Sequence, residues 1–281
     1  MSPCDDQGGL RARNLSAGYG RSLILRELDL AVPPGAFTAL VGPNGSGKST
    51  LLHALAGLLA PREGAVLLDG EAISRLPVKA LAKRVSLLAQ GPIAPEGLTV
   101  FDLVQQGRYP HRALFERWSA RDVAACDEAL RLTDMAVLRD RPLADLSGGQ
   151  RQRAWIAMTL AQEAEIVLLD EPTSFLDLAH QIEVMELVVE LVRGRGKTFV
   201  AVLHDLNQAA RYVDHMVLLK AGRIMAAGAP AQVLTAEAIA TVFGVAATVV
   251  PDPVTGTPMC VPLCASLLPV GPMAAGGGGV A

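Results

Sequence analysis

Short, mostly apolar runs alternate with longer segments of helical periodicity along most of this chain. The short runs are bounded by glycine or polar residues, as is typical of buried strands, and span residues 36–41, 85–89, 166–169 and 198–203. A segment between two of them has apolar side chains three or four positions apart, at Ile182, Met185, Val189 and Val192, which predicts a helix that ends at Gly194 and Gly196. Strands that alternate with helices predict an α/β fold with a mostly parallel sheet.

Antiparallel strands are predicted at both sides of this pattern. Residues 10–15 and 23–32 are partly alternating apolar runs separated by the turn-rich residues 17–20, and residues 65–68 precede an Asp-Gly turn. Residues 213–219 and 224–227 are typical of a hairpin. We therefore expect an antiparallel β subdomain beside the main sheet.

The middle of the chain, about residues 92–164, changes from glycine-marked strands to helical periodicity. Ser119 and Asp122 have the spacing of a capping box before an apolar-periodic helix. This segment predicts a helical subdomain within one domain of residues 9–264. After it, residues 235–243 predict a short helix, residues 248–250 and 259–261 predict two strands around a turn, and the Gly- and Pro-rich residues 265–281 predict a disordered tail.

A glycine-rich loop follows the run at 36–41 and precedes a helix that we expect to extend from Lys48 to about residue 59, before Pro61. We call this segment the phosphate loop. It consists of Gly42, Pro43, Asn44, Gly45, Ser46, Gly47, Lys48, Ser49 and Thr50. Three glycines allow a sharp turn that aims backbone N–H groups inward at a helix N-terminus, which favours phosphate binding. Lys48 suits the β- and γ-phosphates and Ser49 suits Mg²⁺. The alternative is a glycine-rich turn with a solvated lysine.

Two carboxylates end the buried run at 166–169. Asp170 emerges at the carboxyl end of a predicted strand, where an open α/β sheet places its ligands, so it is a candidate to hold Mg²⁺ through water. Glu171 is the candidate general base for an attacking water. In isolation, the same pair could be a solvated turn.

A second loop-to-helix junction, the LSGGQ segment (residues 146–150), precedes another helical pattern. Ser147 and Gln150 could simply form a capping box. A capping box does not require Gly148 and Gly149, however, and these glycines expose backbone N–H groups at the positive end of a helix. The segment is therefore a candidate phosphate-binding site.

With these motifs in order, the chain resembles the ATP-binding subunit of ABC transporters, from Tyr19 to about residue 230. The matching order is the phosphate loop, Gln90, the LSGGQ segment, Asp170-Glu171, the SFLD segment (residues 174–177) and His204. The resemblance implies a P-loop NTPase (RecA-like) fold and a head-to-tail homodimer with two ATP molecules between the subunits. Each ATP would meet Lys48, Ser49 and Thr50 of one chain and Ser147, Gly148 and Gly149 of the other.

The same resemblance implies roles for four single residues. Tyr19 would stack on adenine, Gln90 would sense Mg²⁺ and the γ-phosphate, Asp177 would link the two sites, and His204 would contact the γ-phosphate. Without the resemblance, Tyr19 could be an exposed aromatic residue, Gln90 a strand-end polar residue and His204 a buried, hydrogen-bonded histidine. We interpret the other histidines as structural, namely His53, His111, His180 and His215.

Residues 107–111 and 174–181 are similar to those of the importers of ferric siderophores, haem and cobalamin. In the family, the region from 91 to about 118 receives the coupling helix of a permease. Its apolar and aromatic side chains would suit such a partner: Leu98, Phe101, Tyr109, Leu114, Phe115 and Trp118. The resemblance thus implies integral membrane permease subunits as partners and, indirectly, a periplasmic or surface substrate-binding protein.

Composition narrows the alternatives. The 281 residues are 51% apolar and 19% charged, with a formal charge of -3, so we expect no nucleic-acid partner. No apolar run approaches the roughly 20 residues of a membrane span, and the charged N-terminal residues do not suggest a secretory signal. We expect a peripheral protein on the cytoplasmic face of the cell membrane. Cys4, Cys126, Cys260 and Cys264 have no zinc-site spacing and are interpreted as reduced thiols.

Two other classes of function remain open from the sequence. One is a soluble ABC ATPase that acts on nucleic acid or ribosomes, although such proteins usually have two cassettes or a long coiled-coil insertion. The other is a scaffold protein with an inactive nucleotide site, against which the presence of Lys48, Asp170, Glu171 and His204 argues.

Overall fold

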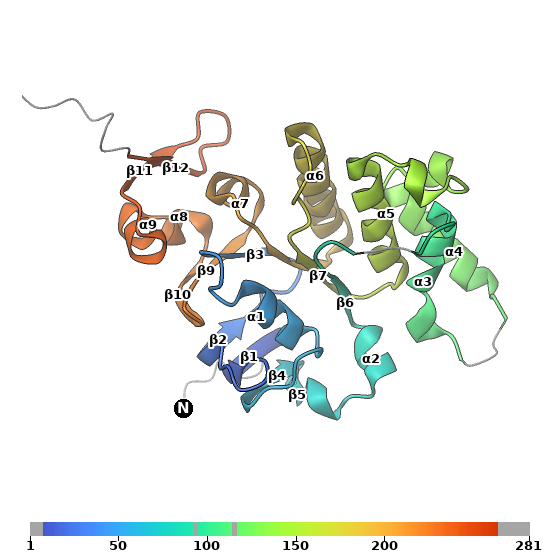
Figure 1. Cartoon of the computed structure of the whole chain (residues 1–281), viewed down its shortest axis with the longest axis horizontal. Helices are drawn as coiled ribbons and strands as arrows, with labels where there is room; N and C mark the ends of the chain where they lie inside the picture. Colours follow the sequence, from blue (N-terminus) through green and yellow to red (C-terminus); the bar gives the residue numbers. More distant parts are fainter. Residues whose placement is uncertain (1–7, 93–94, 114–116, 264–281) are drawn as a thin grey trace, which may run out of the picture.

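The computed structural model describes residues 8–92, 95–113 and 117–263 (Figure 1). These residues form a central six-stranded sheet, a smaller antiparallel sheet and a two-stranded hairpin, with helices around them. The predicted tail at 265–281, Cys4, Cys264, Leu114 and Phe115 lie outside the described residues. The domain bounds 9–264 stay a prediction.

The central sheet has the strand order β10-β9-β3-β8-β7-β6. Its strands are β3 (Phe37–Val41), β6 (Val85–Leu88), β7 (Ile166–Asp170), β8 (Thr198–Val202), β9 (His215–Lys220) and β10 (Arg223–Gly228). Neighbouring strands are parallel except for β9 and β10, which form the predicted hairpin. The prediction of a mostly parallel α/β sheet is confirmed.

The smaller sheet is antiparallel, in the order β2-β1-β4-β5. It consists of β1 (Leu10–Ala17), β2 (Leu25–Ala31), β4 (Glu63–Leu68) and β5 (Glu71–Ala72). Near the other end of the chain, β11 (Ala247–Pro251) and β12 (Pro258–Pro262) pair as the predicted hairpin.

Nine α-helices occur among the described residues. They are α1 (Lys48–Leu55), α2 (Val78–Ala82), α3 (Val100–Gln106), α4 (Ala120–Leu132), α5 (Gly148–Ala161), α6 (Leu178–Arg195), α7 (Leu206–Tyr212), α8 (Pro230–Val233) and α9 (Ala236–Phe243). Short 3-10 turns occupy Ile73–Arg75, Tyr109–His111, Ala136–Leu138 and Leu143–Asp145. Among these helices, none is long and apolar enough to cross a membrane.

The prediction that the first helix extends to about residue 59 is wrong. Helix α1 ends at Leu55, because Gly57 takes a left-handed backbone conformation with φ of 74°. A side chain on Gly57 would meet Leu81 at 2.7 Å, so glycine permits both the turn and the close approach of the segment that carries α2.

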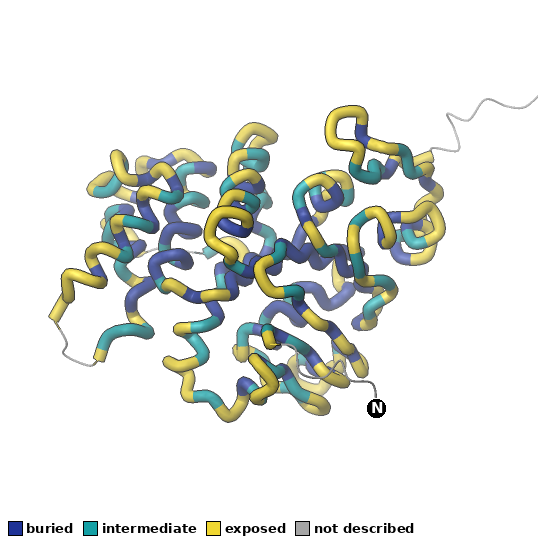
Figure 2. Tube along the Cα trace, turned by 180° about the vertical axis from the view of Figure 1, so that it is seen from behind, coloured by how far each residue is buried: buried dark blue, intermediate teal, exposed yellow. Residues whose placement is uncertain are grey.

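The central strands are buried on both faces, which explains their continuous apolar sequence. Alternate residues of a strand point to opposite faces. Thus Val167 and Leu169 of β7 join the core under α3–α7, while Leu168 joins the core shared with α1 and the smaller sheet. Figure 2 shows the buried positions gathered along the middle of the molecule, with exposed positions on the outer turns.

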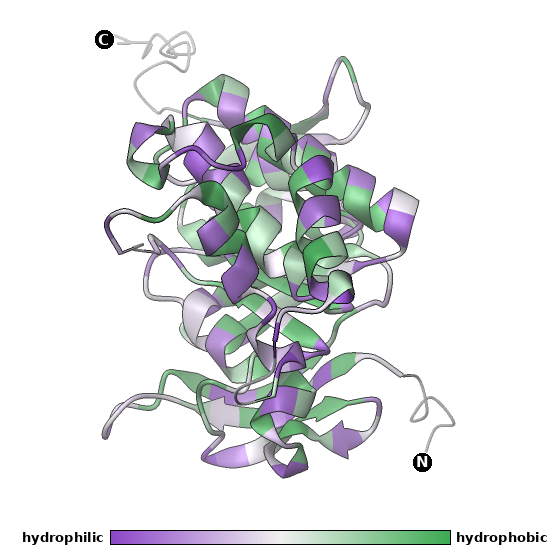
Figure 3. Cartoon of the chain, turned by 90° about the vertical axis from the view of Figure 1, so that its right-hand side faces the viewer, coloured by the Kyte–Doolittle hydropathy of each residue, from purple (hydrophilic) through white to green (hydrophobic). Residues whose placement is uncertain are grey.

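Helices α3, α4 and α5 pack together at one end of the molecule (Figure 1). Seen from that end, they carry hydrophilic positions next to hydrophobic ones, as expected of amphipathic helices (Figure 3). Helix α4 starts with the predicted capping box, in which the Ser119 hydroxyl accepts from the backbone N–H of Asp122.

A buried ion pair lies inside this helical end. The Arg108 side chain is 1% exposed and donates from Nε to Oδ1 of Asp122 at 3.0 Å. It also donates to the carbonyl oxygen of Ala161 at 2.7 Å and to Glu163 at 2.7 Å. One guanidinium group therefore connects the segment after α3 with α4 and the end of α5.

Candidate nucleotide site

The phosphate loop connects β3 to α1. Gly47 is the N-cap of α1 and has φ of 103°, a conformation that favours glycine. Lys48 is buried, and its Nζ donates to the carbonyl oxygens of Gly42 at 2.9 Å and Pro43 at 3.0 Å. Burial lowers the pKa of Lys48, against the opposing charges of Glu171 and Asp170. The ammonium group is therefore held by the loop itself, next to the two carboxylates.

Parallel strands bring the other predicted polar groups to the same edge of the sheet. Gln90 follows β6, Asp170 ends β7 with Glu171 next to it, and His204 follows β8. Residues more than a hundred positions apart thus face the phosphate loop.

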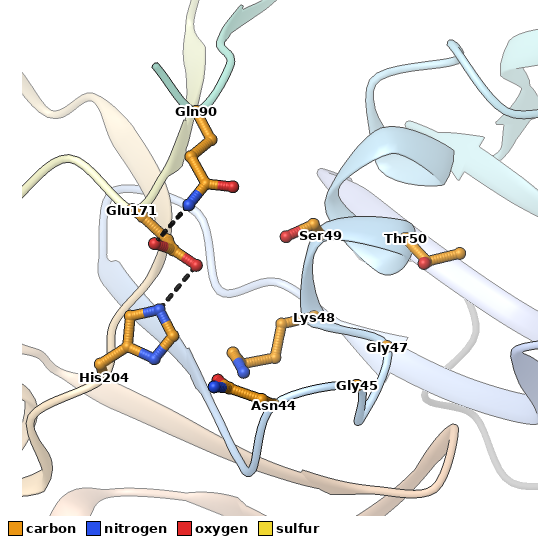
Figure 4. Close-up of a pocket in the computed structure, with 9 residues that line it drawn as sticks. All are labelled: Asn44, Gly45, Gly47, Lys48, Ser49, Thr50, Gln90, Glu171 and His204. Atoms are coloured by element: carbon orange, nitrogen blue, oxygen red, sulfur yellow. Dashed lines mark hydrogen bonds and ion pairs between the residues drawn. The ribbon is translucent and has the colours of Figure 1, made fainter. Parts of the chain in front are cut away.

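Glu171 is the centre of a hydrogen-bonded cluster (Figure 4). Gln90 Nε2 donates to Glu171 Oε2 at 2.7 Å, and His204 Nε2 lies 2.6 Å from Glu171 Oε1. The Ser174 hydroxyl donates to Oε2 at 2.8 Å. Burial acts to raise the pKa of Glu171, but the hydrogen bonds from His204 and Ser174 outweigh it and lower the pKa. Glu171 is therefore ionised near neutral pH and is held in one orientation.

Asp170 contacts the start of α1. Its Oδ1 accepts a hydrogen bond from the Ser49 hydroxyl at 2.9 Å, and the carboxyl is buried. Burial is the main reason that the pKa of Asp170 is raised, although the Ser49 hydrogen bond opposes the shift. A hydroxyl and a carboxylate oxygen side by side form a pair of hard donors, which suits Mg²⁺.

These groups surround a cavity of about 410 Å³, a size suited to a small-molecule ligand. It is lined by Asn44, Gly45, Gly47, Lys48, Ser49, Thr50, Gln90, Glu171 and His204. In Figure 4 the Glu171 carboxylate lies between Gln90 and His204, and the Gln90 amide oxygen points toward Ser49. Each lining residue belongs to the set that the sequence predicts, and the individual roles stay predictions.

The structure does not bring the LSGGQ segment into this cavity. Ser147 is the N-cap of α5, and it forms the capping box that the sequence left open as an alternative: its hydroxyl accepts from Gln150 N at 3.2 Å, and Gln150 Oε1 accepts from Ser147 N at 3.1 Å. Asp177 is likewise absent from the cavity lining and caps α6. Within one chain, then, the two candidate phosphate-binding elements do not share a cavity.

Tyr19 also lies outside the cavity lining, but it is linked to the site through His53. The Tyr19 hydroxyl is 3.0 Å from His53 Nδ1, and His53 Nε2 is 3.9 Å from Asp170 Oδ2. The interpretation of His53 as merely structural thus misses this link, and no role was predicted for Ser174 alone. A usable signal existed for each: His53 is four positions after Ser49 on α1, on the same helix face, and Ser174 is three positions after Glu171.

The fold and the cavity define a P-loop nucleotide-binding protein, with carboxylates at the ends of parallel strands facing a phosphate loop. Among the described residues, no group of three or more His, Cys, Asp or Glu side chains is arranged to hold a metal ion.

Comparisons with known proteins identify the family. The model of the ABC transporter family matches residues 25–174. The chain is 50% identical to the ferric enterobactin transport ATP-binding protein FepC of Escherichia coli (strain K12), over 90% of this chain and 94% of that protein. It is 51% identical to the achromobactin transport ATP-binding protein CbrD of Dickeya dadantii (strain 3937), over 90% of this chain and 94% of that protein.

Solved structures agree. A chain of an ABC transporter assigned to the metal-chelate type, in an inward-facing conformation, superposes with a TM-score of 0.81 at 29% identity, over 93% of this chain and 100% of that chain. The dimeric bacterial ABC transporter cassette MJ0796 superposes with a TM-score of 0.68 at 29% identity, over 78% of this chain and 98% of that chain. The chain belongs to the ABC transporter family, which confirms the resemblance seen in the sequence.

Proposed function

We propose that this chain is the ATP-hydrolysing subunit of an ABC importer that takes up an iron complex through a separate permease. The single observation that carries the catalytic part is the Glu171 carboxylate, oriented by Gln90 and His204 opposite the phosphate loop. The importer part rests on relatives named for the transport of ferric enterobactin, achromobactin and iron(3+)-hydroxamate. A cobalamin import protein is a more distant relative, at 40% identity.

The phosphate loop binds the ATP phosphates in this proposal. Its N–H groups and the start of α1 face the β- and γ-phosphates, and Lys48 exchanges its contacts with the carbonyl oxygens of Gly42 and Pro43 for contacts with the ligand. Ser49 and Asp170 would hold Mg²⁺, and the Gln90 amide oxygen would face it from the other side. When bound, the ion supplies positive charge that offsets the charge developing on the phosphates.

Glu171 acts as the general base. It accepts a proton from the water that attacks the γ-phosphate, and its ionised state suits that role. His204 and Gln90 each contact one of the two carboxylate oxygens and thereby fix the direction in which the base faces. His204 would also contact the γ-phosphate.

A second copy of the chain completes the site. The first-turn N–H groups of a helix have no partner within the helix, and the amides of Gly148 and Gly149 lie in the first turn of α5. In a head-to-tail homodimer they would face the γ-phosphate bound by the other copy, while Tyr19 stacks on adenine and Asp177 links the two sites. The dimeric structure of a related cassette supports this arrangement.

The partners follow from the importer assignment. The chain would bind integral membrane permease subunits as a peripheral protein on the cytoplasmic face of the membrane, and a substrate-binding protein would act indirectly by delivering the iron complex. We expect no nucleic-acid partner, because the formal charge is -3.

Reconstitution tests the proposed function. The chain is copurified with its permease, placed in proteoliposomes and supplied with ATP on its own side of the membrane. We expect ATP-dependent transport of a labelled ferric siderophore, with haem and cobalamin as comparison substrates and Glu171→Gln as the inactive control. Copurification with ribosomes or nucleic acid instead of a permease, together with ATPase activity that only those partners stimulate, would contradict the importer assignment.

A further inference from the structure

The N-terminus of α6 packs directly against the two glycines of the LSGGQ segment. A Cβ atom added to Gly149 would lie 2.0 Å from Cδ2 and 2.5 Å from Cγ of His180. A Cβ atom on Gly148 would lie 3.7 Å from Cδ2 of Leu176. The imidazole ring of His180 therefore occupies the space in which any other residue at position 149 would place its side chain.

Asp177 holds this ring in place. Its Oδ1 accepts from the backbone N–H of His180 at 3.0 Å and lies 2.7 Å from His180 Nδ1. The same carboxylate oxygen thus caps α6 and anchors the ring. The contact at Nδ1 restrains the imidazole beside Gly149, and the contact at the backbone N–H fixes the start of the helix that carries it.

The position of this ring matters because it packs against Gly149, whose amide lies with that of Gly148 in the first turn of α5. The capping box uses the N–H groups of Ser147 and Gln150, and the helix ladder begins with Arg151 N, which donates to the Ser147 carbonyl oxygen at 2.9 Å. The amides of Gly148 and Gly149 lie between these positions. Glycine has more backbone freedom than other residues, so the contact from His180 adds to the capping box in restraining the backbone that carries these amides.

We infer that His180 is a positioning residue that fixes the Gly148 and Gly149 amides relative to Asp177. The LSGGQ segment and the SFLD segment then form one rigid unit that each chain presents to the ATP of its neighbour. This inference rests on the proposed function, because it requires that Ser147–Gln150 act on the nucleotide bound by the other copy. The ring also explains why glycine is required at position 149, since a side chain there would overlap His180.

A mixed dimer separates the two sides of one ATP site. One copy carries Ser147→Arg and supplies a working phosphate loop, while the other carries Lys48→Ala and supplies a working LSGGQ segment. The mixed dimer therefore has a single complete ATP site. The two copies carry different affinity tags, so that purification in two steps isolates the mixed dimer. His180→Ala is then introduced into one copy or the other, and the ATPase rate is measured against ATP concentration.

We expect His180→Ala in the copy with the working LSGGQ segment to lower kcat by about 10-fold or more, because small misplacements of catalytic groups are costly. The KM for ATP should change less than kcat. The same substitution in the other copy should also lower kcat, but the fold-loss should be several times smaller. Because both dimers contain the same variant once, a general folding defect would affect them equally.

Glu183→Ala is the matched control. Glu183 also lies on α6 and pairs with Arg153 of α5 at 2.7 Å, whereas the atoms nearest to an added Cβ at Gly148 or Gly149 belong to Leu176 and His180. We expect this variant to retain most of the parental rate in either copy. Equal losses from His180→Ala in both copies, or no loss in either, would overturn the positioning role while leaving the composite site intact. An inactive parental mixed dimer would instead contradict the proposed dimer, and the inference with it.

Discussion

His204 Nε2 lies 2.6 Å from Oε1 of Glu171, and this contact joins the second residue after β8 to the first residue after β7. Gln90, after β6, contacts the other carboxylate oxygen. The carboxylate is thereby held from two sides by neighbouring strands of one sheet, and its pKa is lowered although burial acts in the opposite direction.

Replacing this carboxylate tests its role as a base. Glu171→Gln keeps the size of the side chain but cannot accept a proton at neutral pH. We expect turnover to fall by about 10²- to 10⁴-fold, with ATP still bound, as measured by ATPase rates and equilibrium nucleotide binding. Unchanged ATPase activity would rule out Glu171 as the general base.

His53 connects Tyr19 to Asp170, so His53→Ala and Tyr19→Phe should have related effects. Each removes the same hydrogen bond, worth about 0.5–1.5 kcal/mol, and each should raise the KM for ATP by roughly 2- to 10-fold. Because Tyr19 is linked to Asp170 through His53, the double variant should be little worse than His53→Ala alone. Fully additive effects in this double-mutant cycle would show that the contact does not serve nucleotide binding.

Arg108 should be essential for the stability of the helical end. Arg108→Ala leaves the buried Asp122 without its charged partner, and breaking a buried ion pair in this way costs about 3–5 kcal/mol. Urea denaturation measures the difference. Arg121→Ala is the control, because the Arg121 side chain is 77% exposed and lies 3.7 Å from Glu163, so a change below about 1 kcal/mol is expected. Similar losses for the two variants would contradict this account.

The same ion pair predicts a pH dependence of stability. Burial acts to raise the pKa of Asp122, but hydrogen bonds from Ser119 and Arg108 outweigh it, so the pKa lies below its ordinary value in the folded chain. As the pH falls, Asp122 therefore takes up a proton in the unfolded chain before it does so in the folded chain. The stabilisation from the ionised Asp122 is fully present above about pH 4 and is lost as the pH falls through the lower pKa of the folded chain.

Asp122→Asn should remove this part of the acid sensitivity. The variant is expected to be less stable than the wild type at pH 7, and the difference in Tm should narrow toward pH 3. Thermal unfolding followed by circular dichroism at several pH values checks the prediction. A difference in Tm that stays constant with pH would mean that the charge of Asp122 does not contribute.

The central strands and the phosphate loop were predictable because their physical causes are local. Strands such as β7 are buried on both faces and must be continuously apolar, and the loop before Lys48 needs glycine where its backbone turns sharply. The capping boxes at Ser119 and Ser147 are likewise set by residues three positions apart.

Other features depend on tertiary contacts that no local pattern contains. The close approach of Leu81 to Gly57 follows from the packing of α2 near the end of α1, and the place of His180 beside Gly149 follows from the packing of α6 against α5. His53 lies near Asp170 only because β7 runs beside α1 in the folded chain. In the sequence, His53 is marked only by its spacing of four positions from Ser49, and His180 is indistinguishable from an ordinary structural histidine.

The central claim is that one ATP site is built from the phosphate loop of one copy and the LSGGQ segment of another. The most direct test is the ATPase rate of the mixed dimer of Lys48→Ala and Ser147→Arg copies, beside the two variant homodimers. We predict no hydrolysis above background in either homodimer and measurable hydrolysis in the mixed dimer, which retains one complete site. If the mixed dimer is as inactive as the homodimers under conditions where one site suffices, the two segments do not share an ATP and the claim is wrong.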